Sequence, residues 1–243
     1  MKEIKTYITE KLKVTKYYTL FPKSSNELKQ MINDEISKNG VNCSLNHIDV
    51  SEITDMTAMF YDSQFMGDIS KWDVSNVTKM ESMFYDSYFD GDISNWDVSN
   101  VTTMNGMFAF SKFNGDISDW NVSKVESMAR MFQQSDFTGD ISNWDVSNVE
   151  YMAEMFERSK FNGDISDWDV SKVLSMRGMF RWSNFNKDIS KWNVSNVKNM
   201  YAMFAYSKFN QDISNWDVSN VTTMDNMFGV SPLQNNPPKW YKK

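Results

Sequence analysis

The sequence predicts a solenoid, a fold in which short equivalent coils stack along one axis. A segment such as GDISNWDVSNVTTMNGMF (residues 91–108) recurs along most of the 243-residue chain. Repetition at a fixed period is typical of stacked folds. The tryptophans that mark the repeat lie 24 residues apart without a slip, at Trp72, Trp96, Trp120, Trp144, Trp168, Trp192, Trp216 and Trp240.

The apolar residues within one unit have two spacings. Trp96 and Val98 alternate around Asp97, which is the period of a strand. Residues 101–108 then place apolar side chains every three to four positions, which is the period of a helix. Gly115-Asp116 supplies turn chemistry before the next unit. We therefore expect a short parallel strand, a helical turn and a return loop in each coil, with the Trp, Met and Phe columns in the core.

Repeat register divides the chain into three parts. Residues 1–47 form an N-terminal helical cap, residues 48–231 the solenoid, and residues 232–243 a C-terminal cap or tail. The units begin at residues 48, 72, 96, 120, 144, 168, 192 and 216. A capping box of Ser24 and Glu27, with Gly40 as the stop, predicts a helix over residues 24–40. We also expect a second short helix over residues 3–12 and an extended stretch over 14–21. In the tail, Pro237-Pro238 should end the pairing between coils, because proline has no N–H to donate.

A family resemblance follows from the order of residues in the repeat. The pattern I-x-x-W-x-V-x-x-V-x-x-M-x-x-M-F over residues 45–231 resembles the leucine-rich repeat, L-x-x-L-x-L. DISNWDVSNV, followed by M-x-x-MF and S-x-F-N-G, resembles more closely the BspA-like leucine-rich repeats of bacterial surface proteins and mycoplasma lipoproteins. The resemblance implies a leucine-rich-repeat-like solenoid of about eight coils, with a role in adhesion or protein interaction.

Charge and hydropathy exclude several classes of function. The formal net charge is −7, and eight Lys against five acidic residues give residues 1–47 a charge of +3, so residues 48–243 carry −10. An acidic solenoid does not suit nucleic acid, whose phosphates need a basic face. We expect no membrane span and no disulfide, since Cys43 is the single cysteine. MKEIKTYITEKLKVTK lacks the apolar core of a secretory signal, which predicts a cytoplasmic location, whereas the resemblance implies the cell surface.

Two acidic columns and the repeated serines are the candidates for chemistry. Asp residues recur before each strand (Asp116, for example) and within it (Asp97). They could chelate calcium or accept hydrogen bonds in turns, and the second interpretation is favoured because the nonapeptide pattern G-G-x-G-x-D is missing. Serines recur in every unit, but a nucleophile needs a base, and His47 is the only histidine. We therefore expect no enzyme activity, no cofactor and no metal.

Variable residues at two places in the repeat are the candidates for recognition. Thirteen and fourteen places after each Trp the repeat fixes no residue type, and several aromatic or arginine residues lie there. Such residues dominate protein interfaces. We name these seven residues the edge strip: Tyr61, Tyr85, Phe110, Arg158, Arg181, Trp182 and Tyr206. The sequence thus predicts a monomeric protein-interaction module with a host or bacterial protein as its partner. The alternative is a structural solenoid that assembles end to end.

Overall fold

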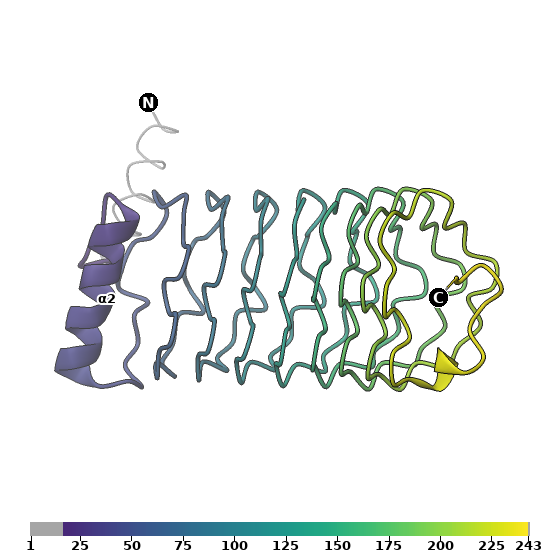
Figure 1. Cartoon of the computed structure of the whole chain (residues 1–243). Helices are drawn as coiled ribbons and strands as arrows, with labels where there is room; N and C mark the ends of the chain where they lie inside the picture. Colours follow the sequence, from purple (N-terminus) through teal and green to yellow (C-terminus); the bar gives the residue numbers. More distant parts are fainter. Residues whose placement is uncertain (1–16, 243) are drawn as a thin grey trace, which may run out of the picture.

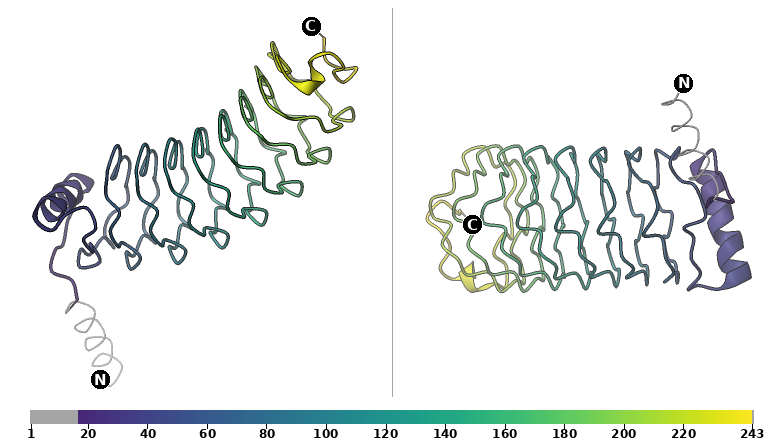
Figure 2. Two further views of the ribbon diagram at one scale, coloured as in Figure 1. Left: turned by 90° about the horizontal axis from the view of Figure 1, so that it is seen from below. Right: turned by 180° about the vertical axis from the view of Figure 1, so that it is seen from behind.

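The computed structural model describes residues 17–242 and shows a solenoid. Helix α2 (Ser25–Asn39) covers one end, and the 3-10 helix η1 (Pro232–Gln234) lies at the other, with the coils side by side between them (Figure 1). The stack curves along its length (Figure 2). The repeat solenoid predicted from the tryptophan period is confirmed. The expected helix over residues 3–12 lies outside the described residues, as does the first part of the extended stretch over 14–21.

Neighbouring coils are joined by a ladder of backbone hydrogen bonds. In the first coil the N–H groups of Met56, Ala58, Phe60 and Asp62 donate to carbonyls of the second coil at 2.8–2.9 Å. The equivalent four groups make the same bonds in the next six coils. One isolated parallel β-bridge accompanies the ladder at each step, as between Thr103 and Ser127. Every coil is therefore held to the next by four alternate N–H groups.

The local conformation of each coil differs from the expectation. No strand is assigned anywhere in residues 17–242, and the bridge lies seven places after the Trp instead of at the predicted Trp-x-Val strand. The predicted helical turn is replaced by successive turns, such as the one closed by Met107 N–H on the Met104 carbonyl at 3.2 Å. The reason is a positive φ at the tenth and fourteenth places, as at Gly106 (61°) and Phe110 (60°). Positive φ interrupts a right-handed helix, and the N–H groups then pair across coils.

The tryptophan column is buried and hydrogen bonded. The Trp144 side chain donates from its indole nitrogen to the carbonyl of Ile117 in the preceding coil at 3.0 Å, and the residue is 3% exposed. The same bond recurs at 3.0–3.2 Å for each of the eight tryptophans that mark the repeat. Each of these tryptophans therefore stabilises the fold in two ways, through the apolar area that it buries and through the hydrogen bond that its indole donates.

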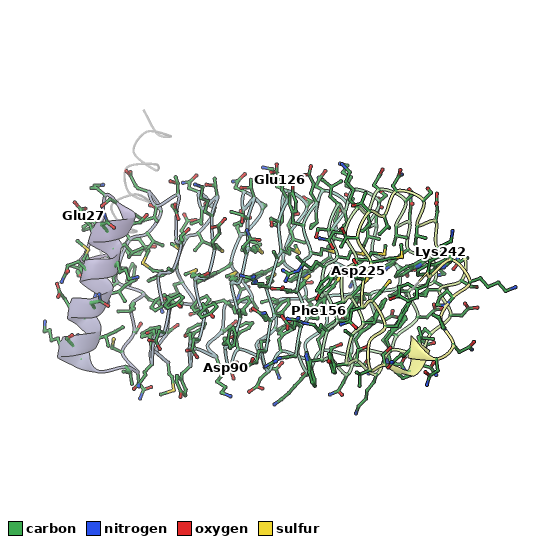
Figure 3. All side chains as sticks on the ribbon, in the orientation of Figure 1. Glu27, Asp90, Glu126, Phe156, Asp225 and Lys242 are labelled. Atoms are coloured by element: carbon green, nitrogen blue, oxygen red, sulfur yellow. The ribbon has the colours of Figure 1, made fainter. Side chains whose placement is uncertain are left out.

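Phenylalanine fills the rest of the core. The Phe132 ring stacks on those of Phe108 and Phe156, with 5.8 Å between centroids in both directions. Figure 3 shows Phe156 inside the stack, while Asp90 and Glu126 project from opposite edges. The core is thus one continuous apolar column along the whole solenoid.

Helix α2 covers the N-terminal end of the stack. Ser24 is its N-cap and accepts the Glu27 N–H at 3.2 Å, and Gly40 ends the helix with a φ of 85°. Leu28 and Ile32 are buried against the first coil. The Lys29 ammonium donates to the Ala58 carbonyl at 2.8 Å. The helix therefore covers apolar side chains of the first coil and donates hydrogen bonds to its Asp55 and Ala58 carbonyls.

Candidate functional site

The edge strip contains a stacked, half-exposed aromatic pair. The Trp182 and Tyr206 rings lie 4.1 Å apart with an interplanar angle of 2°, and the residues are 49% and 41% exposed. The Arg158 guanidinium lies over the other face of Trp182, 5.7 Å from the ring centroid. All three residues occupy the fourteenth place, where φ is positive. Three consecutive coils thus align an arginine, a tryptophan and a tyrosine.

A second aromatic group lies nearer the N-terminal end. Tyr61 stacks on Tyr85 at 4.8 Å, and Tyr85 meets Phe110 at 5.1 Å and an angle of 47°. Burial raises the pKa of the Tyr85 hydroxyl. Gln134 separates this group from Arg158 in the order of coils. The edge strip therefore consists of two aromatic groups, and the polar residue Gln134 lies between them.

The thirteenth place is less free than the sequence suggested. Ala109 and Ala205 are fully buried there, and Glu157 is 3% exposed. The Glu157 carboxylate accepts from Gln133 at 2.6 Å and from the Arg181 guanidinium. Large residues such as Tyr61 reach solvent from this place, but small ones belong to the core. Of the two variable places, the fourteenth is the one that consistently faces outward.

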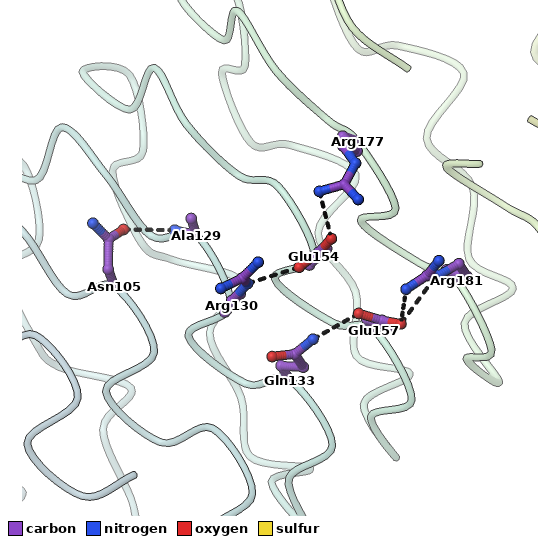
Figure 4. A network of polar contacts seen from close by, with 8 residues as sticks. All are labelled: Asn105, Ala129, Arg130, Gln133, Glu154, Glu157, Arg177 and Arg181. Carbon is purple, nitrogen blue, oxygen red and sulfur yellow. Dashed lines mark hydrogen bonds and ion pairs between the residues drawn. The ribbon is translucent and has the colours of Figure 1, made fainter. Parts of the chain in front are cut away.

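Beside the strip, a second buried carboxylate lies between two arginines (Figure 4). Glu154 accepts from Arg130 at 2.7 Å and from Arg177 at 2.8 Å, and its side chain is only 6% exposed. The hydrogen bond to Glu154 also raises the pKa of Arg130. Both arginines remain 44–58% exposed, so the pairing fixes them in place while leaving them open to solvent.

Arg130 and Glu154 were missed as site residues in the sequence, although a signal was present. They occupy the tenth place of adjacent units, which elsewhere holds small residues such as Gly106 and Ala202. Residues 24 apart lie one above another in a solenoid, so opposite charges at that spacing predict an ion pair. All four arginines of the chain lie between residues 130 and 181.

The two columns of aspartate residues accept hydrogen bonds within turns. The Asp116 carboxylate accepts from the Ser118 N–H at 3.0 Å and the Ser118 hydroxyl at 2.7 Å, and the equivalent Asp92, Asp140 and Asp164 each accept the N–H of the serine two residues later. The second column makes such bonds too, including where Asn121 replaces aspartate. Within residues 17–242 no group of three His, Cys, Asp or Glu side chains is arranged to hold a metal ion.

These bonds predict how stability depends on pH. Hydrogen bonds from the Ser118 N–H and hydroxyl lower the pKa of Asp116, and Asp140 and Asp164 are lowered in the same way. A carboxyl group whose pKa is lower in the folded chain stabilises it above the unfolded pKa of about 4, and the gain is lost as pH falls through the folded value. We expect the free energy of unfolding, measured with urea at a series of pH values, to fall below about pH 4.

A triple variant provides the control for this pH dependence. Asn accepts the same hydrogen bonds in the second column, at Asn121, without titrating. The variant with Asp116, Asp140 and Asp164 replaced by Asn should therefore lose less stability in acid than the unaltered chain. Identical acid profiles for the two proteins would contradict the assignment.

Serine and histidine side chains have structural partners. Ser111 is buried, and its hydroxyl donates to the Phe108 carbonyl at 2.9 Å. His47 lies 3.3 Å from Glu35 and joins α2 to the first coil. No helix in residues 17–242 is long and apolar enough to cross a membrane.

Comparison with known protein families identifies the family to which this chain belongs. A family model described as "Mycoplasma protein of unknown function, DUF285" matches residues 26–138 and again residues 134–240. The chain belongs to this family. The double match agrees with the internal repeat, so DUF285 is a repeat family here, and the narrower BspA-like resemblance is carried forward only as a hypothesis. No curated protein and no solved structure matches the chain.

Proposed function

We propose that this DUF285 chain is a non-enzymatic binding module whose edge strip holds another protein. The observation that supports the proposal is the half-exposed Trp182–Tyr206 stack with Arg158 beside it. The architecture accepts Asp62 and Gln134 at the same fourteenth place. The aromatic side chains are thus not demanded by the fold, and aromatic and arginine residues provide most of the energy in protein interfaces.

Charge indicates the chemistry of the partner. The four arginines, with Glu154 and Glu157 between them, leave a formal charge of +2 on a solenoid that is otherwise acidic. Both faces of Trp182 are occupied, by Arg158 and Tyr206, so a partner meets the ring edges. Trp182 and Tyr206 are 49% and 41% exposed, so the indole N–H and the phenol hydroxyl are available as hydrogen-bond donors to a partner. A protein surface with carboxylates beside apolar side chains fits these donors.

Absence of a convergent catalytic set among the described residues supports a binding role over catalysis. The buried carboxylates of Glu154 and Glu157 are each engaged by arginine, and the serine hydroxyls close turns. A nucleophile or general base needs a proton-accepting partner within hydrogen-bond reach. We therefore place the function in recognition.

The location of the protein, outside or inside the cell, determines which class of partner the edge strip can bind. The BspA-like resemblance favours adhesion, which requires the strip to be outside the cell, whereas a cytoplasmic chain would meet a bacterial protein. Protease treatment of intact cells, followed by immunoblotting for the chain, separates the two proposals. Cleavage supports adhesion, and full protection supports an internal partner.

The binding test uses substitutions that the fold should tolerate. We expect the double variant Trp182→Ser and Tyr206→Ser to melt like the unaltered chain but to weaken partner binding by about 2 kcal/mol, or roughly thirtyfold in Kd. Partners are captured from host and bacterial lysates on both proteins, identified by mass spectrometry, and then titrated in purified form. Tyr88→Ser is the matched control, since Tyr88 is 55% exposed but lies outside the strip. Unchanged affinity of the double variant for every captured partner would refute the proposal.

A further inference from the structure

The last coil presents an incomplete hydrogen-bond ladder. Its N–H groups at Met224, Asn226, Phe228 and Val230 are equivalent to the four that join each earlier coil to its successor. Val230 donates to the side-chain carbonyl of Gln234 at 2.8 Å. For Met224, Asn226 and Phe228 no acceptor exists within residues 17–242. Phe228 is 1% exposed and lies under the Tyr241 ring, so its N–H is buried, whereas Asn226 is exposed and Met224 is half-buried. An N–H group that is buried and unpaired is rare in proteins and costs free energy.

Apolar side chains beside this row are also left uncovered. Val218, Val221 and Met224 are partly exposed, whereas their equivalents one coil earlier, Val194, Val197 and Met200, are at most 1% exposed. The tail covers a different part of the coil. Trp240 stacks on Trp216, and Tyr241 packs edge-on against Phe228 at 5.0 Å. The open surface, which we name the terminal face, therefore combines the N–H donors of Met224 and Asn226 with three apolar side chains.

The structure of the N-terminal end rules out a second copy of the chain, stacked end to end, as the occupant of the terminal face. The matching carbonyls are those of Asp55, Thr57, Met59 and Tyr61 in the first coil, and α2 lies on this side of it. The Ser25 hydroxyl is 2.6 Å from the Asp55 carbonyl, and Lys29 donates to the neighbouring Ala58 carbonyl. A second copy therefore cannot stack its first coil here while α2 is in place. Two terminal faces do not complement each other either, because the N–H row of one would face the N–H row of the other, and the Thr222 carbonyl lies beyond the end of that row.

We propose that the terminal face binds an extended segment of another polypeptide that carries the V-x-x-M-x-x-M-F pattern of the repeat. The chain forms this interface seven times internally, with the same donors and the same apolar partners. An added segment offers carbonyls at alternate residues to Met224 and Asn226, and covers Val221 with its own valine. This is strand-addition recognition, in which backbone bonds give affinity and side-chain pockets give specificity. The proposal is independent of the edge strip.

The test uses a synthetic peptide of residues 98–112 (VSNVTTMNGMFAFSK) and the whole chain labelled with ¹⁵N. We expect the peptide to bind and to slow amide hydrogen exchange at Met224 and Asn226 by about tenfold or more. A peptide of the same composition, with its apolar residues out of register, should leave these amides unchanged. No slowing at these two amides with millimolar peptide, or equal slowing by both peptides, would overturn the proposal.

Two variants locate the site. Val221→Asp puts a charge on the terminal face and should weaken peptide binding by about tenfold or more. Thr223→Asp adds the same charge in a neighbouring column that holds Asp55 in the first coil, and should leave binding unchanged. Equal binding by the two variants would contradict the assignment, as would sedimentation showing that the chain itself associates through this face. The exchange measurement on the unaltered chain decides the matter even if Val221→Asp perturbs the last coil.

Discussion

Replacing Trp144 with alanine is expected to lower the free energy of unfolding by about 3–5 kcal/mol, because it leaves a cavity in a close-packed column. Trp144 is 3% exposed and lies in the middle of the stack. The loss includes its indole bond, since the Ile117 carbonyl would keep no indole donor. Urea unfolding followed by fluorescence measures the effect, and a melting curve like that of the unaltered chain would refute the stacked core.

Two further substitutions separate the contributions of area and hydrogen bond. Trp144→Phe keeps an aromatic ring but removes the donor, and should cost about 1–3 kcal/mol. Trp240→Ala removes the equivalent bond at the partly buried C-terminal end, where less apolar area is lost. Trp144→Ala should therefore lower the free energy of unfolding more than Trp144→Phe or Trp240→Ala does.

Replacing Ala202 with proline should destabilise the chain by about 3 kcal/mol or more. Ala202 has a φ of 53°, whereas proline fixes φ near −65°. Its N–H donates to the Asp225 carbonyl of the next coil at 3.0 Å, and proline would remove that bond. Thermal melting measures the loss, and an unchanged melting temperature would mean that the ladder does not hold the coils together.

A pair of glycine variants tests the backbone conformation without disturbing the ladder. Ala202→Gly should stabilise the chain by up to about 1 kcal/mol, because glycine adopts positive φ without steric cost and already occupies this place at Gly106 and Gly178. Ala205→Gly should destabilise it by a similar amount, since Ala205 is buried with an ordinary φ. Effects of the same sign would contradict the conformation.

The sequence predicted the stacking but not the conformation within each coil. A period of 24 residues and strict tryptophan register require equivalent residues to stack, whatever the local backbone. The spacing of Val101, Met104, Met107 and Phe108 fits a helix and a series of turns equally well. Both conformations return side chains to one face every three to four residues. Positive φ at Arg130 or Trp182 was not predictable, since glycine is the residue that normally signals it.

The candidate site was partly predictable for the same reason. The position of Trp182 above Tyr206 follows from their spacing of 24 residues, and the pairing of Arg130 with Glu154 follows by the same rule. The indole bonds do not follow, because each joins residues 27 apart and depends on the direction of a side chain. The open ladder at Met224 and Asn226 depends on how far the tail reaches over the last coil, which the sequence pattern does not specify.

Hydrogen exchange of the nine tryptophan indole N–H groups tests the central claim most directly, namely that a hydrogen-bonded core column coexists with an exposed strip. In two-dimensional ¹H–¹⁵N spectra, the seven indoles from Trp72 to Trp216 that mark the repeat should exchange slowly, because each donates to a buried carbonyl. Trp182, which is 49% exposed, should exchange fastest. Equal rates for all nine, or a protected Trp182 in the free chain, would contradict the account.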